Sequence, residues 1–148
     1  MRFFGDVVVG EKASFGSYAV TREEVPEFAG KYDPQPFHLS DEAAAQAHFG
    51  RLSASGWHSC AMAMSMLVAQ FEAVGHAGLG SPGIDELRFL KPVYPGDTLR
   101  LETEVLEKRR SQSKPEMGSY RSKLELLNQD GVVVLRFVAI DLIRARGE

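Results

Sequence analysis

The stretch from Ala54 to Gly75 restricts the fold of this chain more than any other part of the sequence. It reads ASGWHSCAMAMSMLVAQFEAVG and provides about five turns of helix between a Ser-Gly start and a glycine stop. Apolar residues fall on nearly every side of this helix. A helix that is apolar all round is typical of a buried position, so we expect other elements to wrap it.

We do not expect this helix to cross a membrane. Polar side chains interrupt it, and it lacks the uninterrupted apolar run of about 18 residues that a span requires. The opening sequence MRFFGDVVVGEK is too short and too soon charged for a signal peptide. The predicted location is therefore the cytoplasm.

Composition limits the class of protein further. A chain of 148 residues with 44% hydrophobic content suits a single domain, residues 1–148, with its own core. The net charge of -3 gives no reason to expect a nucleic-acid partner. The single Cys60 cannot form an internal disulfide and is expected to be a small core residue. No His or Cys pair has a metal-ligand spacing such as i, i+4, so no metal site is predicted.

The part of the chain before the long helix predicts one strand and two short helices. Residues 7–20 are typical of a strand with a glycine turn or bulge. Thr21 and Glu24 have the spacing of a capping box, which starts a helix that should stop near residues 30–32. Ser40 is the expected cap of a helix from Asp41 to His48.

The part after the long helix predicts a loop and then a sheet. Gly, Ser and Pro in residues 76–83 indicate the loop. Four strand patterns follow, at Ile84–Val93, Thr98–Lys108, Tyr120–Leu127 and Val132–Ile143. Tight turns at 95–97 and 128–131 and a polar hairpin tip at 109–119 make the strands antiparallel. The pattern predicts an α+β fold with about five antiparallel strands around one long helix.

The segment Asp33–His38, which reads DPQPFH, is the strongest candidate for chemistry. It holds a carboxylate and an imidazole five positions apart, just ahead of the long helix. Pro34 and Pro36 fix two φ angles and push their preceding residues toward extended geometry. The segment is therefore expected to be stiff and non-helical, which helps to aim side chains.

This segment resembles the hydratase motif of the MaoC-like dehydratases, also called (R)-specific enoyl-thioester hydratases. That family has the pattern Asp-x-Asn-Pro-x-His, in which Asp and His are the catalytic pair, and these match Asp33 and His38. A glycine at the start of the family's central helix supplies an oxyanion hole through its N–H and matches Gly56. Residues 87–98, LRFLKPVYPGDT, are also similar to family members. The resemblance covers most of the chain and implies the hotdog fold.

Two residues depart from the family pattern. Gln35 stands where most members have Asn, and Ser55 stands where many have His. The longer Gln35 either re-aims the catalytic pair or marks a subfamily. The predicted substrate-binding positions are Gln35, Ser55, Trp57, Met62 and Arg88.

The resemblance implies hydration of an enoyl-thioester, and the residue types suit that reaction. Adding water across the double bond needs a base, an acid for Cα, and donors for charge on the thioester oxygen. His38 suits the base, and Asp33 suits the orientation of water or shared proton transfer. The Gly56 N–H at a helix N-terminus suits the oxyanion. No cofactor is expected beyond the carrier thioester, which is either an acyl-CoA or an acyl-carrier-protein thioester.

The other histidines and the methionines have plainer expected roles. His58, in the first helical turn, is expected to be a neutral structural residue. His48 and His76 are expected at the surface. Met62, Met64 and Met66 are expected to fill the core, although methionines also suit a lining for an acyl tail.

The cations leave two interpretations open. Lys108, Arg109 and Arg110 are typical of a solvated turn. Alternatively one of them, or Arg88 or Lys91, contacts the phosphates of coenzyme A.

Two alternatives to the hydratase remain open. A hotdog thioesterase needs a carboxylate on the central helix, where the only acid is Glu72, far from Gly56. A non-catalytic acyl-thioester-binding subunit would keep the fold and lose the chemistry, as Gln35 would permit. In each case the open edges of a single sheet and the family analogy favour a homodimer or larger homo-oligomer.

Overall fold

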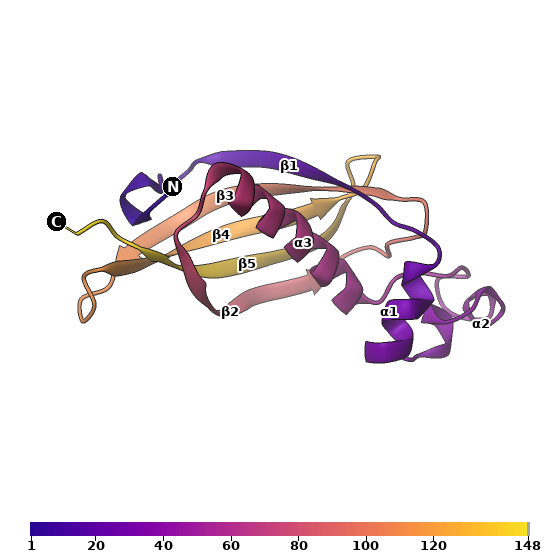
Figure 1. The fold of residues 1–148 in the computed structure, drawn as a ribbon. Helices are drawn as coiled ribbons and strands as arrows, with labels where there is room; N and C mark the ends of the chain where they lie inside the picture. The colour runs from indigo at the N-terminus through magenta and orange to yellow at the C-terminus, as the bar shows by residue number, and fades with distance from the viewer. Residues whose placement is uncertain (148) are drawn as a thin grey trace.

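The computed structural model describes residues 1–147 and contains one five-stranded antiparallel sheet wrapped around a long helix (Figure 1). The strands are β1 (Lys12–Ala19), β2 (Gly78–Phe89), β3 (Thr98–Arg110), β4 (Met117–Leu127) and β5 (Val133–Arg144), in the spatial order β1-β3-β4-β5-β2. The helices are η1 (Phe4–Asp6), α1 (Glu24–Tyr32), η2 (Pro36–His38), α2 (Asp41–Ala45) and α3 (Gly56–Val74). The predicted α+β hotdog architecture is confirmed.

The central helix α3 has nearly the predicted bounds. Ser55 is its N-cap, with Oγ accepting the Trp57 N–H at 3.3 Å. Gly75 ends it at a φ of +74°, a left-handed conformation that favours glycine. No helix within residues 1–147 is both long and apolar enough to cross a bilayer.

One face of α3 forms the core with the concave side of the sheet. The buried residues of α3 include Met62, Ala63 and Met66, and they meet alternate residues of the strands. Leu99 and Leu101 on β3 are completely buried there. A smaller cluster that includes Phe4, Val7, Ala77, Val105, Tyr120 and Ile143 closes the sheet at the C-terminal end of α3.

The expectation that α3 is buried on every side is wrong for a single chain. Trp57, Met64, Val68 and Val74 are all exposed, because the sheet curls over only one side of the helix. The edge strand β2 is also exposed along almost its whole length. One apolar stripe of α3 and the edge of β2 therefore remain uncovered within a single chain, and β1 forms the other open edge of the sheet.

The largest error in the predicted elements concerns residues 76–83. They were expected to form a loop, but Gly78–Gly83 belongs to β2 and pairs with β5. Register shifts occur at these glycines, and Gly80 has a φ of +119°. The glycines that predicted a loop instead allow bulges within a strand. At its other end β2 stops at Phe89 rather than at the predicted Val93. Just after Phe89, the N–H groups of Leu90 and Lys91 both donate to the Val134 carbonyl.

Elements before α3 differ less from the prediction. The first strand is shorter than residues 7–20, and its predicted bulge lies between Phe15 and Tyr18. The capping box is confirmed: the Thr21 N–H donates to Glu24 Oε2 at 2.8 Å, and the Glu24 N–H donates to Thr21 Oγ1 at 3.3 Å. Ser40 caps α2 as expected, but α2 ends at Ala45 rather than His48.

Leu101→Ala should lower the free energy of unfolding by about 2–5 kcal/mol, because it leaves a cavity between β3 and α3. Leu106→Ala on the same strand is the matched control, since Leu106 is 42% exposed. Urea denaturation of both variants measures the difference. Equal losses of stability would contradict the assignment of the concave face as the core.

Candidate active site

The segment between α1 and α2 directs the side chain of His38 toward the protein interior. Asp33 is the C-cap of α1, and Gln35 is extended, as the prolines predict. The remainder differs from the prediction of a non-helical segment, because Pro36–His38 forms the 3-10 turn η2. Proline suits the first position of such a turn, since its φ is preset and it has no N–H to satisfy. The turn buries the imidazole of His38.

The orientation of the His38 ring is fixed by a backbone carbonyl. His38 Nδ1 lies 2.7 Å from the carbonyl oxygen of Ser53, in a buried contact. A carbonyl only accepts, so Nδ1 carries the hydrogen and the neutral ring presents a lone pair at Nε2. His38 Nε2 lies 3.6 Å from Asp33 Oδ2, too far for a direct hydrogen bond. This spacing suits a small molecule that hydrogen-bonds to both groups.

The carboxylate of Asp33 is held from two sides. Ser55 Oγ donates to Oδ2 at 2.7 Å, and Gln35 Nε2 donates to Oδ1 at 2.7 Å. Burial by itself would raise the pKa of Asp33, but these two hydrogen bonds and the nearby His38 outweigh it and lower the pKa. Asp33 is therefore a carboxylate at neutral pH.

Gly56 places the N-terminus of α3 beside the same histidine. The first N–H groups of a helix have no intrahelical partner and carry partial positive charge. Ser55 Oγ binds the N–H of Trp57 rather than that of Gly56. A Cβ at position 56 would lie 2.7 Å from the Phe89 ring, so a side chain does not fit here.

His38 and Gly56 line one open cavity of about 840 Å³. Its walls come from η2, the start of α3, the end of β2 and the loop between β4 and β5. The lining residues that bear on its chemistry are His38, Arg51, Ser53, Gly56, Ser59, Lys91 and Tyr94. The cavity brings the His38 imidazole beside a helix N-terminus. Asp33 does not line the cavity, and its carboxylate reaches the site only through the 3.6 Å approach to His38 Nε2.

A family model described as "MaoC like domain" matches residues 6–125, which is most of the chain. The chain belongs to this MaoC-like family. The MaoC-like dehydratase from Rhodospirillum rubrum is 37% identical, with a TM-score of 0.88 and coverage of 100% of both chains. The R-hydratase PhaJ1 from Pseudomonas aeruginosa is 27% identical, with a TM-score of 0.69 and coverage of 98% of this chain and 86% of that one. The uncharacterized protein YdeM of Bacillus subtilis (strain 168) is 29% identical over 87% of this chain and 89% of its own.

Five further positions of this MaoC-like domain were predicted to bind substrate. Gln35 and Ser55 contact Asp33 and do not line the cavity. Trp57 lies outside the cavity, 58% exposed, with its ring edge-on to Phe89. Met62 is buried in the core, and Arg88 is exposed and donates to the Leu87 carbonyl. Within a single chain, none of the five lines the cavity that His38 and Gly56 share.

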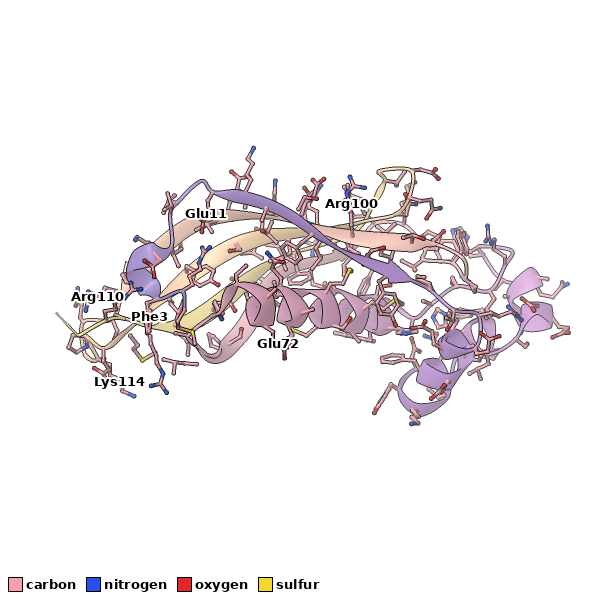
Figure 2. The ribbon with its side chains drawn as sticks, turned by 45° about the horizontal axis from the view of Figure 1, so that its top comes forward. Phe3, Glu11, Glu72, Arg100, Arg110 and Lys114 are labelled. Atoms are coloured by element: carbon pink, nitrogen blue, oxygen red, sulfur yellow. The ribbon has the colours of Figure 1, made fainter. Side chains whose placement is uncertain are left out.

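The cations divide into two groups. Lys91 lines the cavity, whereas Arg88 and residues 108–110 do not. Figure 2 shows Arg110 at the end of the MaoC-like domain opposite α1 and α2. Arg51 also lines the cavity, and its guanidinium lies 3.7 Å from the centre of the Tyr94 ring. Arg51 was not among the predicted phosphate-binding cations, although its place just before the long helix marked it as a basic residue near the helix start.

The Ser53 carbonyl was also missed. Any residue type offers a carbonyl, so no side-chain pattern marks this partner of His38. The structure locates it because Ser53 lies just before α3, where the Ala54 N–H donates to the Val93 carbonyl at 2.8 Å.

His58 has the environment of a neutral structural residue, as expected. Its Nε2 lies 3.1 Å from Glu24 Oε1, and its ring stacks on Phe28. Burial lowers the pKa of His58, with Glu24 opposing the shift. The contact joins α1 to α3 and so helps to place Asp33 beside the helix start.

The other two histidines differ in their outcome. His48 is exposed as predicted. His76 was predicted at the surface, but it is half-buried and hydrogen-bonds to Tyr120.

Among residues 1–147, no group of three or more His, Cys, Asp or Glu side chains is arranged to hold a metal ion.

Ser55→Ala should raise the pKa of Asp33, because it removes a hydrogen bond to the charged form. It should also cost about 1 kcal/mol of stability through loss of the N-cap. A carboxyl whose folded pKa is lowered contributes stability above its unfolded value of about 3.9, which is lost as pH falls through the folded value. The variant should lose less stability on acidification than the wild type.

Carboxyl NMR titration and urea denaturation at pH 7 and pH 3 measure these two effects. Ser65→Ala is the matched control, because Ser65 lies on the same helix and donates to the Met62 carbonyl instead. An unchanged pKa of Asp33 in Ser55→Ala would contradict the assigned role of Ser55.

Proposed function

We propose that this protein adds water to, or removes water from, the 2,3 double bond of an enoyl-thioester. Membership of the MaoC-like family and the likeness to an R-hydratase support a hydro-lyase. The observation that carries the proposal is the 3.6 Å separation of His38 Nε2 and Asp33 Oδ2, together with the cavity that His38 shares with the Gly56 N-terminus. The separation suits a water molecule held by both groups.

In the proposed reaction, His38 Nε2 accepts a proton from this water while Asp33 holds the water by a second hydrogen bond. The resulting hydroxide adds to C3 of the enoyl group, and the electron pair of the double bond moves toward the thioester oxygen. The Gly56 N–H, at the positive end of α3, stabilises this developing negative charge. The proton on His38 then passes to C2, which completes the addition of one water and restores the imidazole.

This chemistry needs no cofactor, because each step moves only a proton or an electron pair within the substrate. One imidazole takes the proton and returns it, so both new bonds would form on the same face of the double bond. The reverse sequence removes water from a 3-hydroxyacyl-thioester. The direction in the cell depends on the supply of the two thioesters.

The cavity lining favours a phosphate-bearing carrier. Arg51 and Lys91 are both exposed and both line the cavity beside His38. Arg and Lys bind phosphate oxygens through charge-assisted hydrogen bonds. We propose that they bind the phosphates of coenzyme A or of the phosphopantetheine arm of an acyl carrier protein.

We also propose a homodimer or larger homo-oligomer as the working form. The unpaired edge of β2 and the exposed apolar residues Trp57, Met64 and Val68 of α3 are features that a second copy would cover. A partner at this surface would also cover the side of α3 on which Trp57 lies, just after Gly56.

The thioesterase alternative has less support. The only acid of α3, Glu72, lies near the C-terminal end of the helix and on its side away from the sheet (Figure 2). It is exposed and does not line the cavity of His38. A carboxylate in that position does not activate water beside Gly56.

His38→Ala and Asp33→Asn should each reduce the hydration rate by at least about 100-fold, the usual contribution of one positioned acid-base group. The measurement is the loss of enoyl-thioester absorbance with trans-2-enoyl-CoAs of increasing chain length. His48→Ala, at an exposed position, is the control. Full activity in either site variant would contradict the proposal.

Two other results would reassign the function. Release of free thiol without loss of the double bond would favour a thioesterase. Saturable acyl-CoA binding with no turnover of any enoyl-CoA would favour a binding subunit.

Arg51→Ala should raise KM for an enoyl-CoA by about tenfold with little change in kcat, because a phosphate contact away from the reacting atoms contributes mainly uniform binding. The matching N-acetylcysteamine thioester, which has no phosphate, should show no such change. Lys31→Ala is a control at an exposed lysine of α1. Equal effects on both thioesters would contradict a role in binding phosphate.

A further inference from the structure

A second cavity lies between the C-terminal half of α3 and the sheet. It has a volume of about 270 Å³, and none of its lining residues lines the cavity of His38. Residues Leu126 and Leu124 of β4 face the apolar core, but the next two positions on that face are Ser122 and Tyr120. A change from apolar to polar on a core-facing side of a strand is typical of a functional position.

The polar end of this cavity contains an aspartate without a partner. Asp141 on β5 lies directly opposite Tyr120 on β4, so both side chains point to the same face of the sheet, and both line the cavity. Among residues 1–147, the Asp141 carboxylate has no hydrogen bond to a side chain or backbone group and no ion pair. Burial raises the pKa of Asp141 to about 6, so it is mainly ionised at neutral pH.

The other charged and titratable groups around Asp141 have partners or face solvent. Arg2 forms an ion pair with Glu11, which lies just before β1 and is labelled in Figure 2, while the buried Nε of Arg2 has no hydrogen-bond partner within residues 1–147. Tyr120 Oη lies 2.8 Å from His76 Nε2, and burial lowers the pKa of His76, which favours its neutral form. Lys12 lines the cavity but is exposed. Asp141 is thus a half-buried charge with no direct hydrogen-bond or ion-pair partner in the described part of the chain, in a cavity that Arg2 and Lys12 also line, and a buried charge without a direct partner is costly.

The remaining walls suit an organic group. Phe15, Leu67, Phe71 and Val74 line the cavity from β1 and α3. The Phe71 ring stacks on His76 with 3.9 Å between ring centres, so both rings are fixed. Aromatic faces attract organic cations, and the volume is slightly below the range of about 300–1,000 Å³ usual for drug-sized ligands. A small ligand with one cationic and one apolar end matches these walls.

We propose that this cavity binds a small primary ammonium with an apolar substituent, with Asp141 as its counter-ion. The ammonium donates to the Asp141 carboxylate beside the Tyr120 hydroxyl, and the substituent contacts Leu67, Phe71 and Val74. The site is independent of the proposed hydratase chemistry, since it shares no lining residue with the cavity of His38.

Titration of the full-length protein with benzylamine, followed by calorimetry at pH 7.5, tests this proposal. We expect saturable binding and at least about tenfold weaker binding of benzyl alcohol, which has a similar shape but no charge. Asp141→Asn should weaken benzylamine binding by a similar factor. Glu116→Gln, at an exposed acid, and His38→Ala, in the other cavity, should bind benzylamine as the wild type does.

The pH dependence separates Asp141 from its neighbours. Benzylamine stays protonated between pH 5 and pH 8, so its affinity should fall as pH drops through the Asp141 pKa near 6. Asp141→Asn should remove this dependence. A dependence that persists in Asp141→Asn would assign it to His76 and would overturn the role of Asp141.

Intermolecular NOEs in the wild type provide a test that does not need a folded variant. The benzyl protons should show NOEs to Leu67 and Phe71. Absence of saturable binding, equal affinity for benzyl alcohol, or NOEs confined to other residues would each overturn the proposal, leaving a cavity filled by solvent only.

Discussion

The candidate site depends on one buried hydrogen bond, from His38 Nδ1 to the Ser53 carbonyl at 2.7 Å. It determines which ring nitrogen has the lone pair and directs that nitrogen toward Asp33. The carbonyl is in place because the chain before α3 is itself anchored to Val93 by a backbone hydrogen bond. The packing of the hotdog core thus sets the tautomer of the proposed base, and a shift of this segment would change the chemistry without altering any side chain of the motif.

Ser55 links the carboxylate to the helix that carries the proposed oxyanion donor. Its hydroxyl donates to Asp33 and accepts from the Trp57 N–H, so one completely buried side chain joins α1 to the start of α3. Gln35 supports Asp33 from the other side. The two departures from the family motif therefore both contact Asp33, which agrees with positioning roles. The proposed chemistry uses Asp33 as a carboxylate, and both hydrogen bonds favour that form.

Local sequence signals predicted the bounds of α3, the capping box of α1 and the extended geometry of Gln35, because each depends on residues close together in the chain. The closeness of Asp33, His38 and Gly56 was predicted from the family resemblance. Tertiary features were missed: the glycines of β2 form bulges only because β5 lies beside them, and His76 is half-buried only because Tyr120 and Phe71 meet it. The position of Met62 relative to the cavity likewise depends on how α3 is rotated against the sheet.

The most direct test of this account is the protonation of the His38 ring nitrogens, measured by 15N NMR at a pH where the imidazole is neutral. We expect hydrogen on Nδ1 and a lone pair on Nε2, in the wild type and in Ser55→Ala alike, because the Ser53 carbonyl is a backbone group. Hydrogen on Nε2 would contradict it, since that nitrogen would then donate toward Asp33 and could not accept a proton from water.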